Sequence, residues 1–268
     1  MQIGYASPMT RAFSLVELSI VLVILGLLTG GILAGQSLIR AAEIRSIATE
    51  YERFTAATQT FRDKYFALPG DMNNATRFWA RTVNAAHCVT SSAAAVGTPG
   101  TCDGNANGTI NGGAAASESG EIFQFWRHLA LAGLIEGTYT GIASTASYEH
   151  SVIGGNIPAS KLSNAGWSAW ASNYAGDASS YAMDYGNGFM FGGVTTSKAQ
   201  NAIIKPEEAW NIDTKLDDGR PAYGKIIARH WSTCNIVNSG VASFSNYDTS
   251  YNLTSTASSC ALHLRQLF

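Results

Sequence analysis

The chain has 268 residues, of which 46% are hydrophobic, 13% charged and 10% aromatic, and its formal net charge at pH 7 is −2. The charged fraction is about half the ~25% typical of soluble domains, and the apolar content argues against a disordered chain. The nearly neutral charge excludes a nucleic-acid-binding protein that works through a strongly basic surface.

The first predicted element is an apolar helix at residues 18–39, which contain no charged residue. At a rise of ~1.5 Å per residue this segment covers roughly 33 Å, enough for the ~30 Å hydrocarbon core of a bilayer. A secretory signal peptide is the competing interpretation, but its apolar region is shorter and is followed by small residues at a cleavage site. Here a helical pattern follows directly, so we predict a membrane-spanning helix.

A short motif precedes this segment and reads Ala12-Phe13-Ser14-Leu15-Val16-Glu17-Leu18. Its carboxylate stands at the edge of hydrocarbon, where an ionisable group costs ~2.5 kcal/mol or more and usually has a functional partner. A simpler interpretation is that Glu17 marks the membrane boundary. Together with the apolar helix, the motif resembles the N-terminal signature of type IV prepilins and type II secretion pseudopilins.

The resemblance implies proteolytic processing. In that family a membrane aspartyl peptidase removes a short leader just before the Phe, and the new amino group is methylated. Here the cut would fall between Ala12 and Phe13, with residues 1–12 as the leader. The family prefers Gly where this chain has Ala12. Translation could begin at Met1 or at Met9, and the second start would leave a very short leader.

The resemblance also implies a location and a set of partners. Residues 13–39 would form the transmembrane and filament-core helix in the inner membrane, with the head in the periplasm. The family's assembly residue, a Glu near the mature N-terminus, corresponds to Glu17. The implied partners are the prepilin peptidase and methyltransferase, the pilus or secretion assembly platform, and other pilin or pseudopilin subunits.

The helix is expected to continue beyond the membrane through residues 40–68. A stripe of mostly apolar residues recurs there at alternating steps of three and four, as on one face of a helix. Its members are Ile44, Ile47, Tyr51, Phe54, Thr58, Phe61 and Tyr65. Pro69-Gly70 should end the pattern. We predict one long helix with a membrane half and an amphipathic half; a separate amphipathic helix after a hinge is the alternative.

Residues 69–268 are predicted to form a globular head, so that the fold class is α+β. A helix is expected between Ser119 as N-cap and Gly137 as stop. A shorter helix should begin at Pro206 and run to about Ile212. Candidate strands are residues 188–195, 223–229 and 260–266. The resulting antiparallel sheet should pack on the N-terminal helix, which is a pilin-like arrangement.

The four cysteines suit an oxidising compartment, where an even number favours disulfides. Three pairings are open, and we favour the local one, Cys88–Cys102 and Cys234–Cys260. Family members often carry a C-terminal loop closed by such a second bridge. A zinc site is the alternative, although the chain has no CxxC pattern.

Residues 103–110 match the first eight positions of a calcium-binding loop, with oxygen-bearing side chains at positions 1, 3 and 5 and Gly at position 6. The twelfth position is Ala114 instead of Glu. The candidate ligands are therefore Asp103, Asn105, Asn107 and Thr109, with Glu118 or Glu121 as the further carboxylate. Plain Asn-Gly turns are the alternative. A second acidic group, Asp213, Asp217 and Asp218, is interpreted as turn chemistry, with calcium binding as the alternative. No other cofactor is expected.

Enzymatic motifs are missing: the sequence contains no GxSxG, HExxH, P-loop or GxGxxG pattern. His128 is interpreted as a packed or surface imidazole and not as a catalyst. An aromatic stretch belongs either to the core and an interface or to a ligand surface, and comprises Trp167, Trp170, Tyr174, Tyr181 and Tyr185. We therefore expect no catalytic residue.

The function expected from the resemblance is structural: a subunit of a type IV pilus or type II secretion pseudopilus, assembled through its N-terminal helix. An adhesin-like minor pilin, whose large head binds a surface or a ligand, is the alternative. A membrane-tethered periplasmic enzyme is the third.

Overall fold

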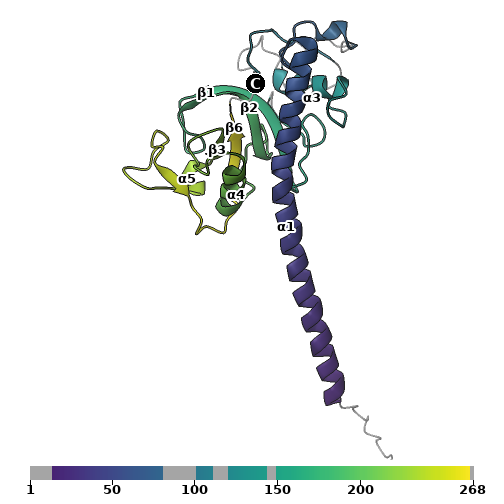
Figure 1. Ribbon diagram of the computed structural model, residues 1–268, viewed down its shortest axis with the longest axis vertical. Coiled ribbons are helices and arrows are strands. Elements are labelled where there is room, and N and C mark those ends of the chain that lie inside the picture. Colours follow the sequence, from purple (N-terminus) through teal and green to yellow (C-terminus); the bar gives the residue numbers. More distant parts are fainter. Residues whose placement is uncertain (1–13, 81–100, 111–119, 144–148, 266–268) are drawn as a thin grey trace, which may run out of the picture. The chain divides into compact units, whose positions relative to one another are not determined.

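The computed structural model describes residues 14–80, 101–110, 120–143 and 149–265 (Figure 1). The chain forms two compact units, Met1–Glu43 and Ile44–Phe268. The first described element, helix α1, spans Leu15–Tyr65 and so belongs to both units. The remaining helices and all described strands belong to the second unit.

Helix α1 is continuous, as predicted, and the alternative of two helices separated by a hinge is wrong for this fold. In the second unit α1 buries the stripe predicted from the sequence. Its buried members are Ile47, Phe54, Thr58 and Phe61, and its partly buried members are Ile44, Tyr51 and Tyr65. The helix ends at Tyr65, before Pro69, because Phe66 adopts a left-handed backbone with φ 53°.

Helix α3 spans Glu121–Leu131 and follows the short 3₁₀ helix η1, Ala75–Arg77. Its N-cap is Gly120 and not Ser119, which lies outside the described residues. The prediction of Gly137 as the stop is wrong. Gly133, with φ 71°, closes the helix: its amide donates to Ala130, and the amide of the next residue donates to Leu129. Those paired bonds satisfy carbonyls that the last turn would otherwise leave without donors.

The main sheet has four antiparallel strands in the order β1-β2-β6-β3. Strands β1 and β2 span Ala165–Tyr174 and Met183–Gly193, and β3 and β6 span Ile226–Arg229 and Ala261–Leu264. Side chains alternate across the sheet, as the strand period of two requires. One face presents Trp167, Phe189, Phe191, Leu262 and Leu264 to the main core.

Helices α1 and α3 cover that face of the sheet (Figure 1). The ring of Phe54 from α1 lies 5.0 Å from the ring of Trp126 in α3 and 5.7 Å from that of Trp167 in β1. Both pairs are edge-on, the geometry that aromatic rings favour. The α+β arrangement predicted from the sequence is therefore present, with an antiparallel sheet packed on the long N-terminal helix.

Two further helices and a second pair of strands follow β2 in the sequence. Helix α4 spans Pro206–Leu216, and the short helix α5 spans Trp231–Cys234. Strands β4 and β5, Asn235–Val237 and Thr249–Tyr251, form a separate antiparallel pair. A second, smaller core is formed by Tyr181, Tyr185, Ala222, Ile227 and Trp231.

The strand predictions are confirmed in position but not in extent. The expected strands at 188–195, 223–229 and 260–266 correspond to β2, β3 and β6. Strand β2 begins earlier than expected, at Met183, and β3 is shorter. Strand β1 was not expected. It contains most of the aromatic stretch, for which the sequence allowed either a place in the core and an interface or a role as a ligand surface. Trp167, Tyr181 and Tyr185 from that stretch are buried, whereas Tyr174 is exposed.

Candidate functional site

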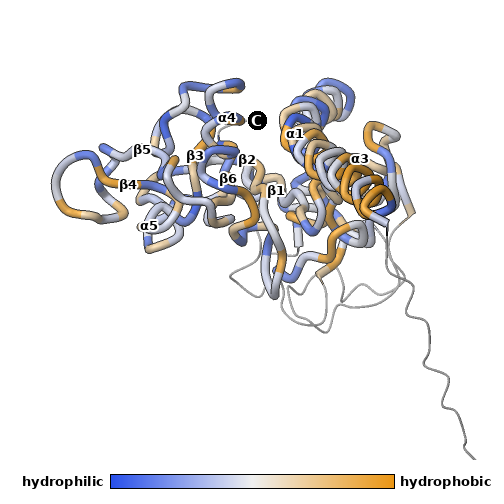
Figure 2. Tube along the Cα trace, turned by 90° about the horizontal axis from the view of Figure 1, so that it is seen from below, coloured by the Kyte–Doolittle hydropathy of each residue, from blue (hydrophilic) through white to orange (hydrophobic). Residues whose placement is uncertain are grey.

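The first part of α1 has an unusual surface. Between Leu15 and Ile39 every Leu, Ile and Val is exposed, and Figure 2 colours this part of the helix as mostly hydrophobic. Among the described residues this helix is long and apolar enough to cross a membrane. Such a segment fits a membrane anchor or a signal sequence, because exposed apolar area of this extent is unfavourable in water.

The helix start gives Glu17 a contact that the sequence reading missed. The Ser14 amide donates to Glu17 Oε2 at 2.9 Å, and the Val16 amide donates to Ser14 Oγ at 3.2 Å. The two bonds cap the start of α1: Glu17 takes the place that Glu has in a capping box, while the Ser14 hydroxyl accepts the N2 amide instead of the N3 amide. Ala12 and Phe13, the expected cleavage and methylation residues, lie outside the described residues.

Glu50 provides a second acidic contact on α1, inside the second unit, where its side chain is only 6% exposed. Its Oε2 accepts a hydrogen bond from Trp167 Nε1 at 2.8 Å, and its Oε1 accepts one from the Lys161 amide at 2.8 Å. Both oxygens are therefore occupied by donors from the segment that leads into β1 and from β1 itself. A buried carboxylate needs such donors, because desolvation without them is costly.

His128 lies at the centre of a third polar contact and is fully buried. Its Nδ1 accepts a hydrogen bond from the Gly70 amide at 2.9 Å, so the proton sits on Nε2, which lies 3.1 Å from the Cys102 carbonyl. Burial lowers the pKa of His128 to about 4. The neutral imidazole thus joins α3 to the turn after α1 and to the cysteine segment, and of the packed and surface positions left open by the sequence it takes the packed one.

The calcium-like loop is held by hydrogen bonds within the protein. The two carboxylate oxygens of Asp103 accept from the amide and the hydroxyl of Thr76, at 2.8 and 2.9 Å. The carboxylate of Asp71 accepts the amides of Asn107 and Gly108, at 3.0 and 2.9 Å. Asp71 was not among the expected ligands. Burial raises the pKa of its carboxyl group.

The other expected ligand residues also form hydrogen bonds within the protein. The side-chain oxygen of Asn105 accepts the Asn107 amide, and that of Asn107 accepts the amide of Thr109. The amide of Asn105 donates to Glu121 Oε1 at 3.1 Å. Glu118 lies outside the described residues. The loop therefore has the turn geometry named as the alternative, and calcium binding stays a prediction.

Three acidic side chains gather at the end of α4. Ligand atoms of Asp213, Asp217 and Asp218 lie within 4.8 Å of one another. Asp213 is fully buried and accepts hydrogen bonds from the Tyr251 hydroxyl at 2.7 Å and the Gly219 amide at 3.2 Å. Burial raises the pKa of Asp213 to about 7. Both oxygens of Asp213 thus have donors within the protein, and Asp217 and Asp218 accept the backbone amides of Ile226 and Arg220, which fits the turn interpretation.

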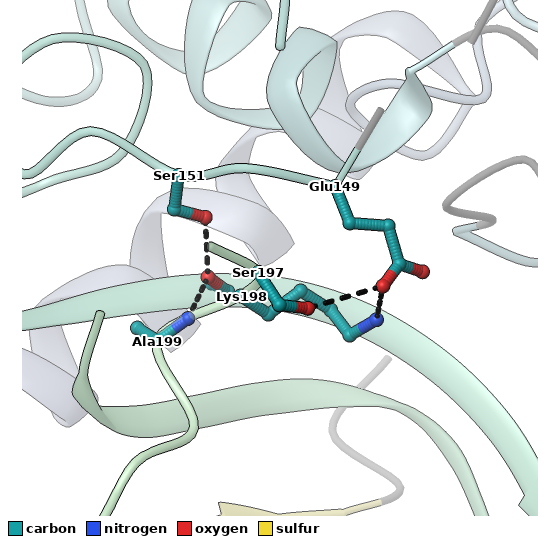
Figure 3. Close-up of polar contacts among 6 residues, drawn as sticks. Glu149, Ser151, Ser197, Lys198 and Ala199 are labelled. Atoms are coloured by element: carbon teal, nitrogen blue, oxygen red, sulfur yellow. Dashed lines mark hydrogen bonds and ion pairs between the residues drawn. The ribbon is translucent and has the colours of Figure 1, made fainter. Parts of the chain in front are cut away.

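An ion pair between a buried lysine and a partly exposed glutamate stands beside β1 (Figure 3). Lys198 Nζ lies 2.5 Å from Glu149 Oε2 and 4.4 Å from the centre of the Trp170 ring. The Ser197 hydroxyl donates to the same carboxylate oxygen at 3.2 Å. Burial lowers the pKa of Lys198, and the charge of Glu149 opposes that shift. The pair connects the segment before β1 to the segment after β2.

The disulfide predicted between Cys234 and Cys260 is present, with Cα atoms 5.0 Å apart. It encloses the β4–β5 pair in one covalent loop, so a zinc site that uses these two cysteines is wrong. Cys102 is also disulfide-bonded. Cys88, its predicted partner, lies outside the described residues.

Comparison with known proteins gives no relative. No protein-family model, no curated protein and no solved structure matches the chain. The resemblance to prepilins therefore rests on the N-terminal motif and the apolar segment that follows it.

Proposed function

We propose that this protein is a structural subunit of a type IV pilus or a type II secretion pseudopilus and not an enzyme. The observation that supports this most is helix α1. Its first part exposes apolar side chains throughout, and the same helix continues into a head whose core it helps to form. A helix of this kind can be held in a bilayer and later packed among copies of itself, since both environments bury the same apolar surface.

In this proposal the chain enters the inner membrane with its head in the periplasm. A prepilin peptidase and methyltransferase then cuts before Phe13, and an assembly platform transfers the subunit into a filament with other pilin or pseudopilin subunits. The Cys234–Cys260 bridge supports the export of the head, because disulfides persist in oxidising compartments.

The deciding experiment is N-terminal mass spectrometry of the protein from membrane and sheared-surface fractions. The expected mature N-terminus is a methylated Phe13 in cells that contain the peptidase, and an unprocessed chain in cells that lack it. A mature chain that begins beyond Leu38 would identify a secretory signal peptide and overturn the proposal.

An adhesin-like minor subunit is the second candidate, and it is favoured by an open cavity in the head at the end of α1. Copy number separates the two roles. A filament body needs the subunit in large excess, whereas an adhesin needs few copies. Quantitative mass spectrometry of purified filaments measures this ratio directly.

A further inference from the structure

The head contains a cavity of about 940 Å³ at the C-terminal end of α1, which is within the usual size range of ligand pockets. Three parts of the second unit border it: the end of α1 with the segment that follows, the loop at residues 103–110, and β2. Its lining is mostly polar and includes Arg62, Asp63, Phe66, Asp71, Asn73 and Asn187. None of these residues belongs to the apolar surface of α1 that the proposed function uses.

Phe66 is the most unusual residue of this cavity. Its side chain is 92% exposed, although Phe is normally buried. Its backbone has φ 53°, in the left-handed region where helix ends usually carry Gly. A bulky residue pays about 1–2 kcal/mol for that conformation. The ring therefore stands at the cavity with almost its whole surface available to a ligand.

A second strained residue lines the same cavity. Ala106 has φ 57°, and the following loop is fixed by the carboxylate of Asp71, which accepts the amides of Asn107 and Gly108. Non-glycine residues keep such sparsely populated backbone conformations only where the surrounding structure holds them. They are found most often at ligand sites and active sites. The wall of the cavity is therefore preorganised by bonds within the protein.

The polar groups define the chemistry of the ligand. Arg62, Asp63 and Asn73 are exposed and offer planar groups with paired donors or acceptors. Such groups suit adjacent hydroxyls, while an exposed aromatic ring suits the apolar face of a sugar ring. The lining carries one guanidinium and two carboxylates, so an anionic ligand is disfavoured. A neutral sugar has adjacent hydroxyls, an apolar ring face and no negative charge, and so matches all three features of the lining.

We propose that this cavity binds a neutral oligosaccharide, with Phe66 stacked on one sugar ring and Arg62, Asp63 and Asn73 hydrogen-bonded to its hydroxyls. This inference goes beyond filament assembly and does not depend on it, because every residue of the site lies in the second unit. A head with this site would give the filament or the cell envelope a means of holding a glycan surface.

The test is calorimetric titration of the full chain in a zwitterionic detergent, since sugar-based detergents would compete. The probes are the trimers of glucose with β1,4 and α1,4 linkage, the N-acetylglucosamine trimer and lactose, with sialyllactose as the acidic probe. We expect saturable binding of at least one neutral probe and at least tenfold weaker binding of sialyllactose.

Two variants make the result specific. Phe66→Gly removes the ring and relieves the positive φ, so it should weaken sugar binding at least tenfold without lowering the melting temperature. Phe78→Ala removes another exposed ring, one that does not line the cavity, and should bind like wild type. Failure of every neutral probe to bind, or wild-type binding by Phe66→Gly, overturns the proposal. Neither outcome affects the N-terminal processing test above.

Discussion

The indole Nε1 of Trp167 donates a hydrogen bond to the carboxylate of Glu50 at 2.8 Å, and both side chains are buried. Helix α1 is thereby fixed to β1 by a charged group as well as by apolar packing. Hydrogen bonds to charged groups contribute ~1.5–3 kcal/mol each, and removing one partner leaves the other unsatisfied.

We expect Glu50→Ala to destabilise the protein by about 3 kcal/mol, because it leaves the Trp167 indole and the Lys161 amide without their acceptor. Glu52→Ala is the matched control, since Glu52 is an exposed acidic residue on the same helix. Thermal unfolding of the full chain in detergent measures both. Equal melting temperatures for the two variants would contradict a stabilising role for the buried carboxylate.

The contact between Glu50 and Trp167 illustrates what the sequence could not predict. The partners are 117 residues apart, and nothing local in either segment indicates the other. His128 and Gly70 are 58 residues apart and present the same difficulty. The stripe on α1, in contrast, was predictable, because helical periodicity is a local property of the chain.

Strand β1 was missed for a different reason. Its sequence, AGWSAWASNY, is rich in small residues and contains no β-branched side chain, so its strand signal is weak despite three aromatic residues. Its strand conformation is set by pairing with β2 along its whole length. The bond from the Ser14 amide to Glu17, on the other hand, was available in the sequence as a Ser-x-x-Glu pattern.

The second prediction concerns pH and His128. Its pKa is about 4 in the folded protein and ~6.5 when unfolded, so only the unfolded state gains a proton between these values. Stability should therefore be constant above pH 6.5 and fall as pH decreases towards 4, by on the order of 3 kcal/mol. His128→Gln should lose this part of the pH dependence. Melting temperatures of both proteins from pH 4 to 8 provide the test.

Asp213 must be included in that measurement because its effect has the opposite sign. Its folded pKa of about 7 lies above the usual 3.8, so the folded state retains a proton that the unfolded state releases. This group alone makes stability fall as pH rises from about 4 to about 7. The Asp213→Asn variant removes this opposing effect. Because burial also lowers the pKa of His230 and of His263, the His128 share is the difference between the Asp213→Asn and the Asp213→Asn/His128→Gln profiles. If Asp213→Asn also shows no loss of stability on acidification, the His128 prediction is wrong.

The third prediction concerns the pair of Lys198 and Glu149. Glu149→Gln leaves a buried ammonium group without its counter-charge. Because Glu149 is partly exposed, the cost should be smaller than the ~3–5 kcal/mol of a fully buried pair. Lys198→Met retains the apolar contact with Trp170 and removes the charge. We expect the double variant to be more stable than Glu149→Gln alone. Thermal unfolding of the two single variants and the double variant tests this, and additive losses would contradict it.

The fourth prediction concerns calcium at residues 103–109. If the loop binds the ion, millimolar calcium should raise the melting temperature of the wild-type protein, since ligand binding to the folded state adds stability. Asp103→Ala should abolish that rise. The variant also removes the acceptor of Thr76, so it should melt lower even in EDTA. Thr76→Val tests the second effect alone: it should melt lower but still respond to calcium. An identical wild-type melting curve in calcium and EDTA would leave the turn interpretation.

The last prediction concerns Glu17, whose carboxylate accepts the Ser14 amide at the start of α1. Under the proposed function, cleavage before Phe13 also creates a charged amino group near hydrocarbon, where a counter-charge from Glu17 of another copy would offset the cost of burial. Two substitutions separate capping from charge pairing. Glu17→Gln can keep the cap, because Gln also serves in a capping box, but it has no charge.

Glu17→Ala loses both the cap and the charge. If pairing with the amino group drives assembly, both variants should be inserted and cleaved yet give at least tenfold less filament than wild type. If Glu17 acts only as a helix cap, Glu17→Gln should assemble normally and Glu17→Ala should show a loss of about 1 kcal/mol in helix stability. Filament yield from sheared cells, with cleavage checked on the same samples, distinguishes these results. Normal yield from Glu17→Gln would refute charge pairing, because no other property of the side chain changes as much.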